Sequence, residues 1–323
     1  QLAEDVEVHA SDEAEVVTVE AVEKSMIQIS VVQKDGETTF LRRFDPNETK
    51  TVRLYLKGGD DQVVRLPGTT AIDLRVVGGK GADQLDDSQS GWTHFYDVGD
   101  GSEVLPGRGT SHDRRPYAHP LEAGNPARDW GRQTLFTPQL KAGGDLGLFL
   151  GGSISKTRYS FRHHPYARSH RLSGGIATSF GGLRGEYLGE FVRENGVART
   201  LLHARASEID LIRFYGFGNE TSSDAPQEFF LIQQRQFSIS PQYQFSFRDI
   251  DVAVGALAQY TSEPPRDSLA AAVLPYGFGG FGKIGPKVDL TLGSRDQPTD
   301  RSRAGRIEVG GSWFPKAWSV EES

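Results

Sequence analysis

Glycine and aspartate recur together at two places in the N-terminal third of the chain, and this combination is typical of calcium-binding turns. The segment Gly78-Gly-Lys-Gly-Ala-Asp-Gln-Leu-Asp86 fits the nonapeptide pattern G-G-x-G-x-D-x-U-x at every fixed position. Gly58-Gly-Asp-Asp-Gln-Val63 is a half match. In such repeats the glycines allow a tight turn, and aspartates with backbone carbonyls bind calcium between stacked coils.

A full set of calcium ligands needs neighbouring repeats, and the chain holds about one and a half of them. Two interpretations are therefore open. The first is a weak calcium site. The second is a pair of Gly-Asp turns that connect strands such as the segment 71–77. We expect no cofactor other than calcium, and the residues that would form its site are Asp61, Gly79, Gly81 and Asp83.

Three glutamates recur at every fourth position, in a pattern that argues against paired acid-base catalysis. On a strand, Glu186, Glu190 and Glu194 would follow one another along one face at intervals of roughly 13 Å. That separation is too large for two carboxylates that work together as general acid and general base. The row favours a charged wall that lines a wet interior.

The other candidate residues match no catalytic or metal-binding pattern. His163 and His164 fall at a turn, and His112 and His119 fall in a loop-rich segment, at spacings that fit no named metal motif. The chain has no cysteine, so it has neither disulfides nor a Cys-type metal site. We expect the chain not to be an enzyme and not to bind nucleic acid.

Strands must position these residues, and the clearest strand begins at Gln236. Apolar and polar residues alternate strictly there, which predicts an extended strand with two unlike faces. Pro241 falls on the apolar face and removes a backbone donor, so we expect a bulge or weakened pairing beside it. The apolar face, which we predict to contact lipid, comprises Phe237, Ile239, Tyr243, Phe245 and Phe247.

The same alternation recurs from residue 133 to residue 323, in roughly nine or ten strands that include a less clear one at 269–282. Runs of about ten residues can cross a bilayer when tilted, and aromatic residues gather near their ends as in interfacial girdles. A soluble β-sandwich with its apolar face inward is the alternative. In the membrane interpretation the lumen-facing residues are Arg184, Glu186, Glu190, Glu194, Gln242, Gln244 and Arg248.

Charge divides the chain into different modules. Residues 1–100 carry 20 acidic and 10 basic side chains, a net charge of −10, so the remainder carries +3 of the total of −7. We predict an all-β protein with a small β module at 1–87 that contains the Gly-Asp turns and a hairpin at Asp35-Gly36. A linker at 88–132 follows, and then an incomplete antiparallel transmembrane β-barrel at 133–323.

Two segments near the C-terminus resemble the bacterial surface-antigen barrel of the BamA/TamA outer-membrane superfamily. They are Leu290-Thr-Leu-Gly-Ser-Arg-Asp-Gln-Pro298 and Gly305-Arg-Ile-Glu-Val-Gly-Gly-Ser-Trp-Phe-Pro315. The segment Arg213-Phe-Tyr-Gly-Phe-Gly-Asn219 is similar to a turn in one branch, where a calcineurin-like metallophosphoesterase sometimes lies upstream. The positions that carry the family turn are Arg295, Asp296, Pro298 and Gly305.

The resemblance implies an outer-membrane protein of a Gram-negative bacterium, with residues 1–130 in the periplasm. It implies a role in protein insertion or translocation, or in anchoring an upstream domain. The partners would be outer-membrane lipid and polypeptide substrates. Barrels of this superfamily have sixteen strands, so we expect the chain to be an internal piece of a longer protein. The alternative function is a secreted calcium-binding or adhesive β protein.

Overall fold

The computed structural model divides the chain into two compact units, Gln1–Ala118 and His119–Ser323. It describes residues 4–99, 101–117, 121–122, 125–126, 128–144, 147–179, 181–217, 224–247, 250–263, 267–275, 278–293 and 306–320. Within these residues the protein is nearly all β, as predicted. None of the described helices is long and apolar enough to cross a membrane.

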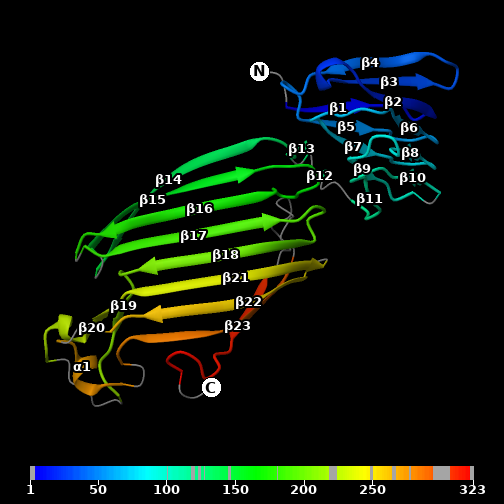
Figure 1. Ribbon diagram of the computed structural model, residues 1–323. Helices are drawn as coiled ribbons and strands as arrows, with labels where there is room; N and C mark the ends of the chain where they lie inside the picture. Colours follow the sequence, from blue (N-terminus) through cyan, green and yellow to red (C-terminus); the bar gives the residue numbers. More distant parts are fainter. Residues whose placement is uncertain are drawn as a thin grey trace. The chain divides into compact units, whose positions relative to one another are not determined.

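The N-terminal unit is a solenoid of two sheets, and from β4 onward the chain passes alternately between them (Figure 1). One sheet is wholly parallel and has the order β1-β5-β7-β9-β11, and the other has the order β10-β8-β6-β2-β3-β4. The strands are β1 (Asp5–His9), β2 (Glu15–Ala21), β3 (Ile27–Gln33), β4 (Thr38–Phe44), β5 (Thr51–Tyr55), β6 (Gln62–Arg65), β7 (Asp73–Val77), β8 (Gln84–Asp86), β9 (Thr93–Tyr96), β10 (Glu103–Leu105) and β11 (Ser111–Asp113).

The core of this unit lies between the two sheets. Strand register stacks Val8, Leu54, Val76 and Phe95 on neighbouring strands of the first sheet, and all four side chains are buried. Val17, Val63 and Leu85 form the matching stack in the second sheet. Each coil thus contributes inward apolar residues from both of its strands, and stacking the coils makes one continuous core.

The predicted hairpin is confirmed, whereas the predicted linker is wrong. Strands β3 and β4 pair antiparallel around the turn at Asp35-Gly36, where Gly36 has φ +90°. Strands β1 and β2 come first among the described residues. A 3₁₀ turn, η1, follows at Glu23–Ser25. The predicted linker at 88–132 contains β9, β10 and β11, so the solenoid continues well beyond residue 87.

The C-terminal unit is built on a single antiparallel sheet of nine strands in the described residues, in the order β14-β15-β16-β17-β18-β21-β22-β23-β24. The sheet is open, with β14 and β24 at its edges (Figure 1). Its strands are β14 (Arg132–Gly143), β15 (Gly147–Arg158), β16 (Arg168–Ala177), β17 (Leu183–Val192), β18 (Ala198–Ser207), β21 (Gln236–Phe247), β22 (Ile250–Thr261), β23 (Phe281–Leu292) and β24 (Ile307–Ser312).

One predicted strand of this sheet is wrong. The segment Leu269–Val273 is a short α-helix, α1, which Ser268 caps by accepting a hydrogen bond from the backbone N–H of Ala271. Its three successive alanines favour a helix and give no alternation. The ninth strand is instead β14. Beside Pro241 the pairing with β22 lacks two partners while the register stays unchanged, so the predicted weakened pairing is present without a bulge.

The two longest connections between strands of the sheet lie at the same end of it. The chain enters β14 at residue 132, at the end that also holds the connections 159–167 and 193–197. The opposite end carries the segment 208–235, with β19 (Leu211–Arg213), η2 (Gln227–Phe230) and β20 (Leu231–Gln233), and the segment 262–280 with α1. A small strand pair, β12 (Leu121–Glu122) and β13 (Asn125–Pro126), precedes the sheet.

Candidate functional site

The C-terminal sheet has an exposed apolar face and a more buried polar face. On β21 the side chains of Ile239, Phe245 and Phe247 are exposed, whereas Gln242 and Gln244 on the opposite face are buried. A sheet that folds around an apolar core shows the reverse distribution. Every predicted lipid-facing residue lies on the exposed face, with Phe237 exposed and Tyr243 half-buried.

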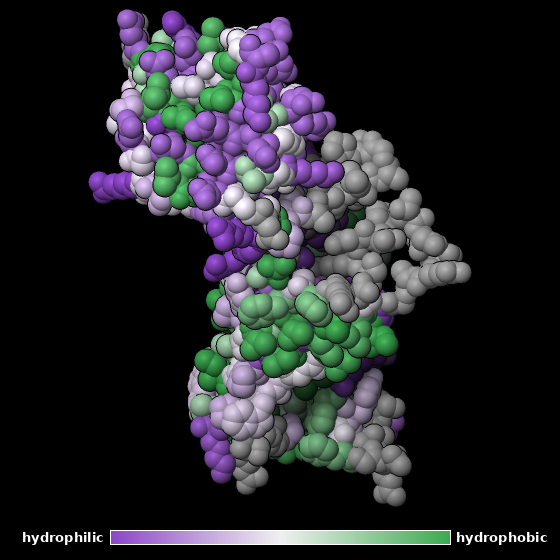
Figure 2. Space-filling view, turned by 90° about the vertical axis from the view of Figure 1, so that its right-hand side faces the viewer, coloured by the Kyte–Doolittle hydropathy of each residue, from purple (hydrophilic) through white to green (hydrophobic). Residues whose placement is uncertain are grey.

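The exposed apolar face continues across the whole sheet. Strand register aligns outward residues on eight neighbouring strands. Figure 2 shows hydrophobic residues gathered into a broad area on this unit, whereas hydrophobic and hydrophilic residues are mixed on the solenoid. One row of outward residues that are register partners on these eight strands comprises Phe136, Ile154, Leu172, Tyr187, Ala204, Ile239, Ala258 and Ile284.

The polar face is held together by charge pairs and hydrogen bonds between strands. Glu186 accepts hydrogen bonds from Arg184, at 3.1 Å, and pairs with His203 Nε2 at 2.8 Å. Glu190 accepts a hydrogen bond of 2.7 Å from the hydroxyl of Tyr166. These carboxylates are therefore occupied by neighbouring side chains, and the bonds to His203 and Tyr166 link β17 to other elements.

The polar face, which we call the polar wall, extends to Asp289 and Lys287 on β23, whereas the predicted member Glu194 lies outside the strands. Gln242 donates to Asp289 at 2.6 Å, and Lys287 lies 3.0 Å from the same carboxylate. Glu194 lies beyond the end of β17, in the connection 193–197. Arg248 lies outside the described residues.

A second candidate site is a column of carboxyl groups in the solenoid. Four turns that lead from the first sheet to the second have the same length, so their last residues stack. Asp61 Oδ1 accepts the backbone N–H of Glu15 at 2.8 Å, and Asp83 Oδ1 accepts that of Asp61 at 3.0 Å. Ser102 Oγ accepts the N–H of Asp83 at 3.0 Å. We call Glu15, Asp61, Asp83 and Ser102 the turn ladder.

The second oxygens of the turn-ladder aspartates have no hydrogen-bond partner. Asp61 and Asp83 are 1% and 0% exposed, and Oδ2 of each is buried and unpaired. The carboxyl of Asp97, whose Oδ2 is also unpaired, reaches into the space left by Gly78. A Cβ there would lie 2.5 Å from Asp83 Oδ2 and 2.8 Å from Asp97 Cγ. Glycine at this position therefore lets two carboxyl groups approach each other.

Burial governs the protonation of the turn ladder. Desolvation raises the pKa of Asp61 to about 7, and the charges of Asp83, Glu15 and Asp60 add to the rise. Desolvation likewise raises the pKa of Asp83 to about 6, with Asp97 and Asp60 as the repelling neighbours. The backbone N–H bonds oppose both shifts. Near neutral pH the carboxyl groups of Asp61 and Asp83 are therefore each present in both charged and protonated forms.

The structure brings the four residues of the calcium hypothesis into two stacked turns. Gly79 and Gly81 have φ of +104° and +124°, and their Cα atoms lie against the preceding turn. Asp61 and Asp83 each use one oxygen to bind a backbone N–H, which leaves one oxygen of each for another ligand. In the described part of the chain, no three Asp, Glu or His side chains converge as a ready-made metal site.

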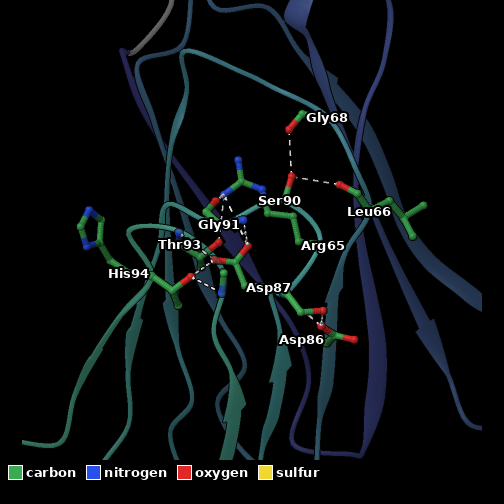
Figure 3. A network of polar contacts seen from close by, with 12 residues as sticks. Arg65, Leu66, Gly68, Asp86, Asp87, Ser90, Gly91, Thr93 and His94 are labelled. Atoms are coloured by element: carbon green, nitrogen blue, oxygen red, sulfur yellow. Dashed lines mark hydrogen bonds and ion pairs between the residues drawn. The ribbon is translucent and has the colours of Figure 1, made fainter.

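The opposite corner of the solenoid holds a buried ion pair that the sequence did not reveal. Arg65 Nη1 lies 3.9 Å from Asp87 Oδ1 and donates to Gly91 O at 2.6 Å and to Thr93 Oγ1 at 3.0 Å (Figure 3). Asp87 accepts the N–H groups of Gly91 and Thr93 and the hydroxyl of Thr110. Burial lowers the pKa of Arg65, and Asp87 opposes that shift. This corner is structural, because its polar groups satisfy one another.

The remaining candidates make local contacts or lie outside the described residues. The ring of His112 packs against Phe95 at 5.1 Å, and His163 Nδ1 contacts Phe161 O at 2.6 Å. His119 lies outside the described residues. The family turn, Arg295, Asp296, Pro298 and Gly305, also lies outside them.

Comparisons with known proteins give the chain no relatives. No family model matches the sequence, and no curated protein or solved structure matches it either.

Proposed function

We propose that the C-terminal sheet is the membrane-embedded part of an outer-membrane β-barrel protein of the surface-antigen type. The observation that carries the proposal is the reversed burial of β21, in which exposed Ile239 and Phe245 alternate with buried Ser240, Gln242 and Gln244. In this proposal the apolar face contacts acyl chains and the polar wall lines a hydrated interior. The resemblance to the BamA/TamA superfamily supports the same assignment.

Strand length fits a bilayer. Five strands of the sheet have 12 residues each, which corresponds to about 40 Å at about 3.3 Å per residue. Tilted by about 45°, such a strand covers about 28 Å, close to the thickness of the hydrocarbon core. Moving each large exposed apolar side chain from water into lipid contributes about 1.5–3 kcal/mol.

The loops and the sheet edges refine the proposal. The long segments 208–235 and 262–280 lie at the end of the sheet opposite the entry of the chain. Outer-membrane barrels carry long extracellular loops and short periplasmic turns, so the entry end would face the periplasm.

The edges β14 and β24 must be paired in lipid, since unpaired backbone groups there cost several kcal/mol each. We propose that further strands complete the barrel and that it assembles proteins or anchors a domain.

Two adjacent substitutions on β21 test the membrane assignment. Phe245 lies on the exposed apolar face, and Ser246 lies on the polar face, where it pairs in register with Asp251. We expect Phe245→Lys to reduce insertion of the full chain into phosphatidylcholine vesicles by at least tenfold, on the order of 2 kcal/mol, and Ser246→Lys to leave it nearly unchanged. Equal effects of the two variants, or a wild-type chain that stays soluble without lipid or detergent, would refute the proposal.

A second candidate function is calcium binding by the turn ladder. Its supporting observation is the pair of buried, unpaired oxygens on Asp83 and Asp97 around Gly78. Titration calorimetry of the full chain should show calcium binding that releases protons near pH 6 and that Asp83→Asn abolishes. Asp86→Asn is the control, because Asp86 is in the same nonapeptide but bonds only to Ser88. Absence of binding at millimolar calcium would exclude this candidate.

A further inference from the structure

Three arginines lie directly opposite one another at the entry end of the C-terminal sheet. Arg132 of β14 pairs in register with Arg158 of β15, and Arg158 pairs with Arg168 of β16. All three side chains are exposed. Two residues further along the strands, Lys156 and His170 are also register partners. We call Arg132, Lys156, Arg158, Arg168 and His170 the basic row.

Strand alternation places the basic row on the apolar face. Arg158 and Lys156 share a face with Ile154 on β15, and Arg168 and His170 share a face with Leu172 on β16. The apolar residues of these strands therefore end where the cations begin. An apolar band that ends in a row of cations matches a bilayer leaflet, in which the acyl chains end at the headgroups.

Among the residues that the structure describes, the basic row has no counter-ion. Within the described residues, none of the side chains of Arg132, Lys156, Arg158 and Arg168 forms an ion pair or a hydrogen bond. By contrast, the arginines of the polar face pair with acids, as Arg184 does with Glu186 and Arg205 with Asp210. Like charges directly opposite on a sheet are destabilising, so an external anion would relieve the repulsion.

Aromatic side chains adjoin the row. The guanidinium of Arg128 lies 5.3 Å from the ring centre of Trp130 and 4.6 Å from that of Tyr159. Tyr159 directly follows Arg158, and Trp130 is exposed. Tryptophan and tyrosine beside cations are typical of the membrane–water interface, where the rings lie at the level of the headgroups.

We propose that the basic row binds the phosphate groups of anionic phospholipids in the leaflet on the entry side of the sheet. Three arginines suit this role, because a guanidinium can donate two parallel hydrogen bonds to a phosphate. The proposal rests on the proposed membrane function. It adds that the embedded protein prefers anionic headgroups and that three adjacent strands determine this preference.

The test compares vesicles of phosphatidylcholine alone with vesicles that also contain phosphatidylglycerol, using the full chain transferred from detergent. We expect the wild-type chain to bind the anionic vesicles more tightly, with a preference that decreases as salt increases. The double substitution Arg158→Gln/Arg168→Gln should reduce the preference about 25-fold, since each cation near a charged surface contributes about a factor of five.

A matched control removes two cations from the polar face of the same three strands. Lys141 pairs in register with the buried Phe149, and Arg171 bonds to Ser155 Oγ, so both lie on the opposite face from the basic row. Lys141→Gln/Arg171→Gln should keep the preference. Equal losses in the two double variants, or no loss in the first, would overturn the proposal. Failure of the wild-type chain to enter phosphatidylcholine vesicles would instead count against the membrane assignment itself.

Discussion

Replacing Asp61 by asparagine should make the stability of the solenoid less dependent on pH. The pKa of this buried carboxyl is raised from 3.8 to about 7 in the folded chain. A raised pKa means that the folded state holds the proton more tightly than the unfolded state. The resulting stabilisation is complete below about pH 4 and disappears as pH rises through about 7.

The size of the effect follows from the two pKa values. Between pH 7 and pH 5, linkage gives about 2 kcal/mol of added stability from Asp61. Asp83, whose pKa is raised to about 6, gives about 1 kcal/mol over the same interval. His112 acts in the opposite direction, because burial lowers its pKa. The comparison of wild type with Asp61→Asn cancels that contribution.

Hydrogen exchange in the full chain provides the assay. The backbone N–H groups of Glu15 and Asp61 bond to turn-ladder carboxyls and report the opening of the stacked turns. After correction for the intrinsic exchange rate, their free energy of opening should rise from pH 7 to pH 5 in the wild type. The rise should be smaller by about 2 kcal/mol in Asp61→Asn. A wild-type free energy that falls, or an identical rise in the variant, would refute the reasoning.

Two further predictions concern the same unit. Gly81→Ala should destabilise it by about 3 kcal/mol or more, because the new Cβ would lie 1.9 Å from Gly59 O. Gly36→Ala, at a similar φ but with nothing within 4 Å, should cost only about 1 kcal/mol. Arg65→Met should destabilise it by about 3–5 kcal/mol, since it leaves the Asp87 carboxylate buried without its cation. Denaturant unfolding followed by circular dichroism measures all three, and a loss below 1 kcal/mol in Arg65→Met would contradict the last.

The strands with long alternating patterns could be predicted from the sequence, because their faces differ in chemistry. The β21 residues Phe237 to Phe247 show this most clearly, and the structure places them on one exposed face. The hairpin at Asp35-Gly36 was also predictable, since the turn residues and both flanking strands are local. In these cases the pattern and the pairing partner lie within a few residues of each other.

The solenoid was not predicted, because its strands are short and their partners are distant in sequence. β8 has three residues, Gln84–Asp86, and pairs with β6 about one coil earlier. Three residues are too few to show a period, so the sequence predicts a linker where β10 and β11 lie. The sequence nevertheless contains a sign of the repeating coils. Asp61 and Asp83 are 22 residues apart, and both directly precede a glutamine that starts a strand.

The equal length of the stacked turns has a consequence for how the solenoid could grow or shrink during evolution. Removing residues 74–92 would bring Thr93 to the place of Leu74 with no change of backbone register, since the two are register partners. The side chains would not match, because Asp97 would replace Gly78 beside Leu56, which is 0% exposed. A charge would then face an apolar neighbour in the interior. The strands of successive coils are therefore equivalent in register, but the side chains of each coil match those of its own neighbours.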